Sequence, residues 1–130
     1  MTTVLLVEDE PDIQDLVTAL LQDEGFGVTM CGNAEQAFEH LSVSLPDVLL
    51  LDGRLPGMSG WLFLEMLRAS ERTATLPILM LTAAPHDVDR YRRDESDACT
   101  SYLVKPFDID TLLDAIQTMI AHCRPQLVAG

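Results

Sequence analysis

Positive charge is scarce in this chain of 130 residues, which has 8 basic and 21 acidic residues and a formal net charge of −13. A nucleic-acid backbone or an anionic membrane surface would be repelled by this charge, so the sequence disfavours direct binding to either. A cation, or a partner with a basic patch, would be attracted. The single lysine, Lys105, therefore stands out.

Cysteine and long apolar runs are also scarce. The three cysteines are odd in number and lack C-x-x-C spacing, which fits a reducing compartment and excludes a typical zinc site. No apolar run approaches the ~18 residues of a membrane span, and the N-terminus lacks the features of a signal peptide. We therefore expect a cytoplasmic protein that does not bind membranes. Its length suits one domain, and a hydrophobic content of 48% is typical of a globular one.

Short apolar runs alternate with helical patterns along the chain. Runs of this kind are typical of strands buried on both faces of a parallel sheet. The expected strands cover residues 4–7, 26–31, 48–51, 78–81 and a shorter segment, 102–104. A strand–helix unit repeated five times predicts an α/β fold, with a parallel five-stranded sheet between two layers of helices.

Helix boundaries are marked by capping residues and by proline and glycine. Pro11 suits the start of the first helix and Gly25 its end. Asn33 is expected to cap the second helix, with Gln36 completing a capping box, and Asp108 is expected to cap the last. The fourth helix, over residues 86–97, is so polar that we expect it to be short, frayed or displaced.

Polar residues follow the apolar runs where the carboxyl ends of parallel strands would meet. Taken singly, each has an ordinary explanation: an acidic residue before a helix, a turn, a strand-end hydroxyl or a solvated surface charge. Taken together, they predict three carboxylates, a hydroxyl and an ammonium group at one edge of the sheet. The residues are Glu8, Asp9, Asp52, Thr82 and Lys105.

Carboxylates that cluster repel one another, and a protein tolerates this arrangement when it binds a cation. Oxygen ligands suit Mg²⁺, with Mn²⁺ as a substitute, and no soft ligand is present to recruit zinc or copper. Lys105 can neutralise a carboxylate or a phosphoryl oxygen. Thr82 can donate a hydrogen bond to a second phosphoryl oxygen. The set is typical of an aspartate that accepts a phosphoryl group.

Four motifs at the ends of these strands resemble the receiver domain of bacterial two-component response regulators. They are Val7-Glu8-Asp9-Glu10, Leu51-Asp52-Gly53-Arg54-Leu55-Pro56-Gly57-Met58-Ser59-Gly60, Leu81-Thr82-Ala83 and Tyr102-Leu103-Val104-Lys105-Pro106-Phe107. The resemblance implies a doubly wound, flavodoxin-like (βα)5 fold with strand order 2-1-3-4-5. It also implies a receiver domain over residues 1–123 and a C-terminal tail over residues 124–130.

The resemblance assigns roles to individual residues. Asp52 would accept the phosphoryl group, and Mg²⁺ would be held by Glu8, Asp9, Asp52 and the backbone carbonyl of Arg54. Lys105 would pair with Asp52 and then with the phosphoryl group. The remaining residues are the switch hydroxyl Thr82, the switch aromatic Tyr102, and Gly53, Ala83 and Ala84, which would line the site.

The resemblance also implies a sensor histidine kinase or phosphotransfer protein as the phosphodonor. An unidentified downstream protein would bind the face made by the fourth helix, fifth strand and fifth helix. The chain would be a monomer or weak homodimer, acting as a signalling domain that promotes its own phosphotransfer and dephosphorylation. We expect no room in the chain for a DNA-binding effector. The protein would be a stand-alone receiver or a fragment of a longer protein.

Two alternatives remain open. A degenerate receiver would be a protein-interaction module independent of phosphorylation, although the intact set of site residues argues against it. An aspartyl-phosphate phosphatase would commonly carry a second aspartate two residues after the nucleophile, where this chain has Arg54. We hypothesise that this long cationic side chain changes the lifetime of the phosphoryl group.

Overall fold

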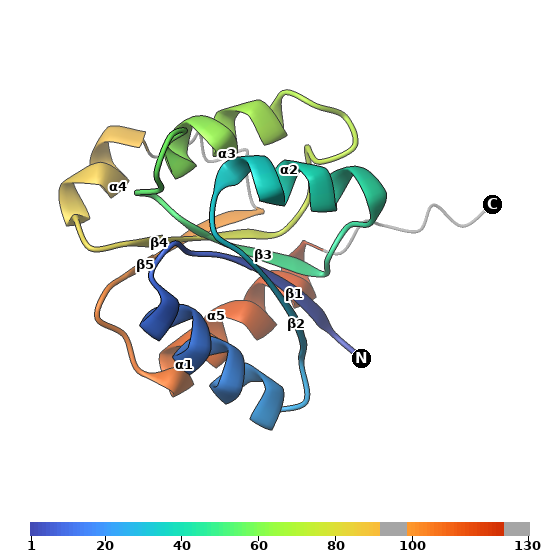
Figure 1. The fold of residues 1–130 in the computed structure, drawn as a ribbon, viewed down its shortest axis with the longest axis vertical. Coiled ribbons are helices and arrows are strands. Elements are labelled where there is room, and N and C mark those ends of the chain that lie inside the picture. The colour runs from blue at the N-terminus through green and yellow to red at the C-terminus, as the bar shows by residue number, and fades with distance from the viewer. Residues whose placement is uncertain (92–98, 124–130) are drawn as a thin grey trace.

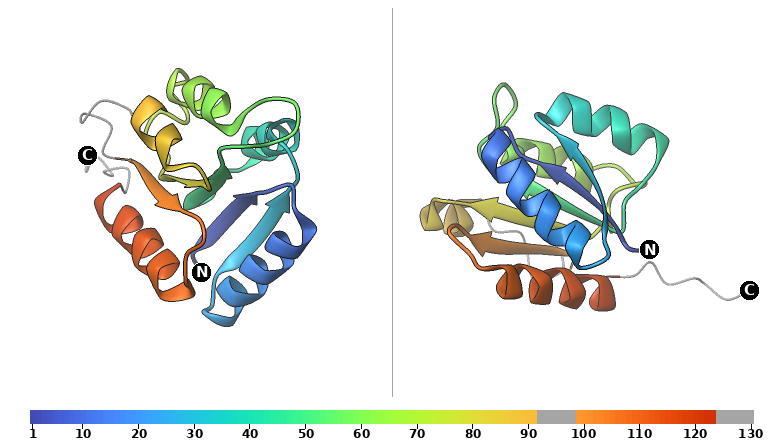
Figure 2. Two further views of the ribbon diagram at one scale, coloured as in Figure 1. Left: turned by 90° about the vertical axis from the view of Figure 1, so that its left-hand side faces the viewer. Right: turned by 60° about the horizontal axis from the view of Figure 1, so that its bottom comes forward.

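The computed structural model describes residues 1–91 and 99–123, and within them a parallel sheet lies between two layers of helices (Figure 1). Its strand order is β2-β1-β3-β4-β5, as expected. The edge strands β2 and β5 are light blue and orange in Figure 2. The strands are β1 (Thr3–Val7), β2 (Gly27–Cys31), β3 (Val48–Asp52), β4 (Ile78–Thr82) and β5 (Thr100–Val104).

Five helices connect or follow these strands. They are α1 (Pro11–Asp23), α2 (Ala34–Val43), α3 (Gly60–Arg68), α4 (Pro85–Tyr91) and α5 (Ile109–His122). α1 and α5 cover one face of the sheet, and α2, α3 and α4 lie on the other (Figure 1). Residues 92–97 of the weak helix predicted over 86–97 lie outside the described residues, as does the predicted tail 124–130.

The central strands β1, β3 and β4 are apolar because both of their faces are buried. Successive side chains of a strand point to opposite faces, so each run contributes to two cores. Leu49 and Leu51 pack with α2 and α3, whereas Val48 and Leu50 pack with α1 and α5. This packing fixes the positions of the strand ends, and therefore of the polar residues that follow them.

The capping residues act largely as predicted. The Asn33 side chain accepts a hydrogen bond from the Gln36 amide at 2.8 Å, and Asp108 accepts one from the Thr111 amide at 2.7 Å. The Gln36 side chain differs from a standard capping box, because it accepts from the amide of Gly32, one residue before the cap.

The fifth strand is longer than predicted. It begins at Thr100 and pairs in register with β4, from Ile78 opposite Thr100 to Thr82 opposite Val104. The apolar pattern misses this start because it is polar and depends on a distant partner. The Arg68 guanidinium donates hydrogen bonds to the Thr100 hydroxyl and to the Cys99 carbonyl, which satisfies polar groups at this end of the strand.

Candidate functional site

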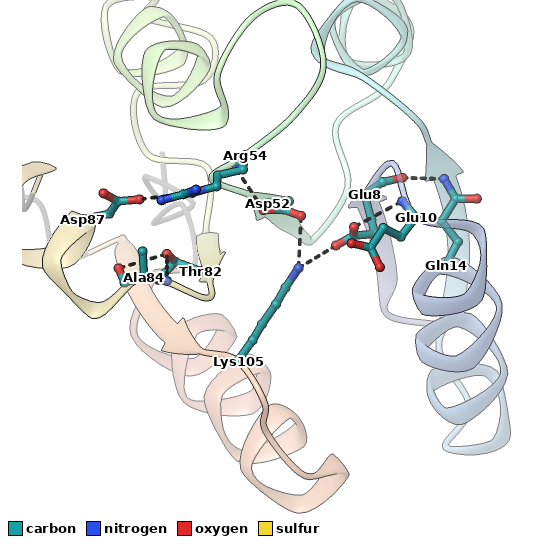
Figure 3. A network of polar contacts seen from close by, with 9 residues as sticks. All are labelled: Glu8, Glu10, Gln14, Asp52, Arg54, Thr82, Ala84, Asp87 and Lys105. Atoms are coloured by element: carbon teal, nitrogen blue, oxygen red, sulfur yellow. Dashed lines mark hydrogen bonds and ion pairs between the residues drawn. The ribbon is translucent and has the colours of Figure 1, made fainter.

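The carboxyl ends of β1, β3 and β5 bring Glu8, Asp52 and Lys105 together (Figure 3). The ammonium nitrogen of Lys105 lies 2.9 Å from Glu8 Oε2 and 3.0 Å from Asp52 Oδ2. One cation therefore bridges two carboxylates that are 44 residues apart in the sequence. The predicted convergence of these three side chains is present in the structure.

Burial gives these charges an unusual environment. Glu8 is fully buried and Asp52 is 6% exposed. Burial raises the pKa of Glu8 to about 7; the Lys105 hydrogen bond opposes this rise and the neighbouring Asp52 carboxylate adds to it. Burial alone would lower the pKa of Lys105, but its hydrogen bonds to Glu8 and Asp52 outweigh that effect and raise it.

Asp9 completes an acidic cluster. Oxygen atoms of Glu8, Asp9 and Asp52 lie within 4.8 Å of one another, and Asp9 is exposed to solvent. Three close carboxylates with one open side form a set of hard oxygen donors, which suits Mg²⁺ better than a soft metal. The donor set therefore fits the metal that the sequence predicts.

Glu8 is also held by residues at the start of α1 to which the sequence pattern assigns no individual role. The Glu10 amide donates to Glu8 Oε1 at 3.3 Å, and the Gln14 side chain donates to the Glu8 backbone carbonyl. Gln14 lies in the first half of α1, on the helical turn next to the strand end. A polar residue at this position gives no signal in the hydrophobic pattern, so only the structure identifies it.

The backbone after Asp52 is held against the start of α3. Asp52 Oδ1 accepts a hydrogen bond from the Arg54 amide at 2.9 Å, and the Gly60 amide donates to the Gly53 carbonyl at 3.1 Å. A Cβ atom on Gly60 would lie 1.8 Å from the backbone oxygen of Asp52. Glycine at position 60 is what allows this close approach.

The Arg54 side chain leaves the site toward α4. It is 74% exposed, and its Nε lies 3.9 Å from the Asp87 carboxylate (Figure 3). The guanidinium of Arg54, two residues after Asp52, therefore lies at the exposed rim of the site. Its ion pair with Asp87 links the β3–α3 loop to α4.

The end of β4 contributes Thr82, Ala83 and Ala84. Thr82 is 2% exposed, and its hydroxyl oxygen accepts a hydrogen bond from the Ala84 amide at 3.0 Å. The hydroxyl is also within donating distance of the Ala84 carbonyl, at 3.2 Å. It thus lies on the strand next to Asp52 and is engaged with the local backbone. Ala83 is exposed and Ala84 is half-buried.

Tyr102 lies on β5 and stacks on Trp61 of α3. The two ring centroids are 6.0 Å apart, with 24° between the ring planes. Trp61 is buried, with only 4% of its surface exposed. The sequence pattern gives no sign of this arrangement, because Trp61 meets Gly53 and Tyr102 from two other segments of the chain.

A family model for the response regulator receiver domain matches residues 4–117 of this chain. The chain belongs to this family. Response regulator receivers are domains of two-component signalling systems, and this one has the acidic cluster at the expected strand ends. Within its described residues, the receiver has no helix long and apolar enough to cross a membrane.

Among its relatives, this receiver is 35% identical over 129 residues to response regulator Rre1 of Synechocystis. The match covers 98% of the chain and 55% of Rre1, so the chain spans about half the length of that curated relative. The likeness therefore covers only part of a longer response regulator.

Two solved structures share the fold of this receiver. The receiver domain of sensor histidine kinase PA1611 from Pseudomonas aeruginosa, with a magnesium ion coordinated in its active-site cleft, has a TM-score of 0.81 and 32% identity. That match covers 92% of this chain and 98% of the other. Response regulator TrrA from Thermotoga maritima, in complex with Mg²⁺–BeF, has a TM-score of 0.77 and 32% identity, over 92% and 99% of the two chains.

Proposed function

We propose that this receiver accepts a phosphoryl group on Asp52 from the phosphohistidine of a sensor histidine kinase or phosphotransfer protein. The observation that carries the proposal is the position of Lys105, which lies within 3.0 Å of both Glu8 and Asp52. Asp52 retains slight exposure, so a donor can reach it. A cation beside the acceptor oxygen offsets the negative charge that a phosphoryl group brings.

Glu8, Asp9, Asp52 and the backbone carbonyl of Arg54 would hold the Mg²⁺ ion, with Mn²⁺ as a substitute. When bound, such an ion neutralises negative charge on the phosphoryl oxygens. The acidic cluster of this chain and the magnesium ion in the PA1611 receiver support this assignment.

In the proposed transfer, an Asp52 carboxylate oxygen attacks phosphorus, and a phosphorus–oxygen bond forms as the phosphorus–nitrogen bond breaks. The electron pair of the broken bond leaves with the donor imidazole, which takes up a proton. Lys105 pairs with one phosphoryl oxygen, and Thr82 gives up its local hydrogen bond to donate to another. Gly53, Ala83 and Ala84 would line the site, and Ala83 is small enough to leave it open. Hydrolysis later returns the carboxylate and releases inorganic phosphate.

The phosphoryl group would then change a binding face formed by α4, β5 and α5. Thr82 ends β4, and Tyr102 lies on the neighbouring β5, so a movement of the Thr82 hydroxyl reaches the face through adjacent strands. The phosphoryl anion would favour the state in which Thr82 faces it and Tyr102 turns inward. An unidentified protein would bind this face.

We also propose that residues 1–123 form the receiver domain, that the protein is located in the cytoplasm, and that it is a monomer or a weak homodimer.

Acetyl phosphate with and without Mg²⁺ tests the proposal. Intact-mass spectrometry should show the addition of one phosphoryl group to the parent protein, only when Mg²⁺ is present. Asp52→Asn should abolish the adduct. Asp23→Asn should leave it unchanged, because Asp23 is an exposed residue at the far end of α1. No adduct on the parent would reject the proposal and favour the degenerate receiver.

A further inference from the structure

The indole ring of Trp61 packs against the backbone that follows Asp52. A Cβ atom built on Gly53 would lie 2.5 Å from Trp61 Nε1 and 2.9 Å from Cε2. These distances are shorter than any real Cβ contact, so the indole occupies the space that a side chain at position 53 would need. Gly53 itself is fixed, because its amide donates to the Leu81 carbonyl at 2.9 Å.

The same indole contacts the switch aromatic on β5. Tyr102 stacks on Trp61, and both rings pack with the apolar cluster between the sheet and α3. Tyr102 is half-buried and lies three residues before Lys105. A single buried side chain thus touches the residue after Asp52 and the ring of Tyr102.

We propose that Trp61 is a positioning residue that couples the state of Asp52 to the orientation of the Tyr102 ring. This inference rests on the proposed function, and it adds a second connection to the one through Thr82. Close-packed interiors transmit displacement, and Trp61 has no free volume on its Gly53 side. A backbone shift at Asp52 and Gly53 would therefore move the indole, and with it the preferred position of Tyr102.

Coupling of this kind is reciprocal, because a ligand at Asp52 that alters the Tyr102 equilibrium must itself be affected by that equilibrium. Loss of the aromatic stack should therefore change the affinity for a phosphoryl analogue by about threefold or more. Trp61→Phe retains an aromatic ring and should preserve most of the coupling. Trp61→Leu retains apolar bulk without an aromatic ring and should lose it.

Fluorine NMR of protein labelled with 3-fluorotyrosine tests the coupling. The chain has two tyrosines, and Tyr102→Phe assigns their signals. Mg²⁺ with beryllofluoride should shift the Tyr102 signal of the parent and of Trp61→Phe, but shift it much less in Trp61→Leu. Calorimetry on the same samples measures beryllofluoride binding independently.

Gly53→Ala provides a second variant that perturbs the indole from its other side. Its Cβ should displace Trp61 and shift the Tyr102 signal without beryllofluoride. Gly32→Ala is the matched control, since the nearest atom to its Cβ would be 3.7 Å away, and it should leave the signal unchanged.

The outcomes separate the two proposals. Beryllofluoride binding with the same Tyr102 shift in the parent and in Trp61→Leu would overturn the coupling alone, as would an unchanged Tyr102 signal in folded Gly53→Ala. If calorimetry and the fluorine signals both show that beryllofluoride does not bind the parent protein, the proposed function is overturned, and the coupling with it.

Discussion

The Lys105 ammonium lies 3.0 Å from the Asp52 carboxylate, although 53 residues separate them in the sequence. The same ammonium lies 2.9 Å from Glu8. Lys105 thus stabilises two buried carboxylates at once, and this arrangement links the charge of the site to its chemistry.

We expect Lys105→Ala to slow phosphorylation of Asp52 by about a hundredfold, since it removes a positioned cation from beside the acceptor oxygen. Phosphorylation by acetyl phosphate, followed by intact-mass spectrometry over time, measures this rate. Circular dichroism and urea unfolding check that the variant is folded. An unchanged rate in a folded variant would show that Lys105 serves only to offset the charge of Glu8.

The pKa of Glu8 predicts how stability depends on pH. Its value in the folded protein, about 7, lies above the ordinary 4.5, so the folded state binds this proton more tightly than the unfolded chain. The resulting stabilisation is complete below about pH 4.5 and is lost as the pH rises through about 7.

The free energy of unfolding of the metal-free parent should therefore fall between about pH 5 and pH 8, by about 2 kcal/mol more than that of Glu8→Gln. Urea unfolding over this range measures the difference, because carboxylates remote from Glu8 titrate equally in both proteins. Parallel pH profiles would contradict the expected Glu8 shift. Added Mg²⁺ should reduce the fall, because it favours ionised Glu8.

The sequence predicts the convergence at the sheet edge for a physical reason, whereas the strand order followed only from the resemblance to receiver domains. Apolar runs identify the strands, and parallel strands place the residues after them together. Glu8, Asp52 and Lys105 could therefore be assigned to one site before the structure was known. Spacing does not define side-chain direction, so the bridging of both carboxylates by one ammonium had to come from the structure.

Contacts between separate elements were the part that sequence patterns could not predict. Trp61 looks like an ordinary apolar residue of an amphipathic helix, and its role depends on the missing side chain of Gly53. Arg54 looks like a loop cation, and its partner Asp87 lies in a helix with almost no hydrophobic pattern. Both relationships require the positions of α3 and α4 relative to β3.

Arg54 should lengthen the lifetime of the aspartyl phosphate, because its exposed guanidinium lies at the rim of the site and would be attracted to the phosphoryl anion. We expect Arg54→Ala to dephosphorylate about fivefold faster, while its stability changes by less than about 1 kcal/mol, as is typical of exposed ion pairs. Phosphate release after removal of the donor measures the rate.

Asp87→Asn separates the cation from its ion pair. It removes the partner at 3.9 Å and leaves Arg54 in place, so the lifetime should be at least as long as in the parent. Equal dephosphorylation rates for Arg54→Ala and the parent would reject a role for the guanidinium.

Gly60 should be sensitive to substitution because α3 begins against the backbone of Asp52. An alanine Cβ at this position would lie 1.8 Å from the Asp52 oxygen, 2.8 Å from its carbonyl carbon and 3.0 Å from the Gly53 Cα. All three atoms belong to the backbone, so no side-chain rotation relieves the overlap, and either α3 or the end of β3 must move.

We expect Gly60→Ala to lower the free energy of unfolding by about 3 kcal/mol, at the upper end of the usual cost of overpacking. Gly32→Ala, whose nearest contact would be 3.7 Å, should change it by less than about 1 kcal/mol. Urea unfolding compares the two variants with the parent. A shift of the end of β3 would displace Asp52 from its position beside Lys105, so beryllofluoride affinity should also fall in folded Gly60→Ala. Similar stabilities for the two variants would mean that the α3–β3 junction yields easily, and Gly60 would then have no part in fixing Asp52.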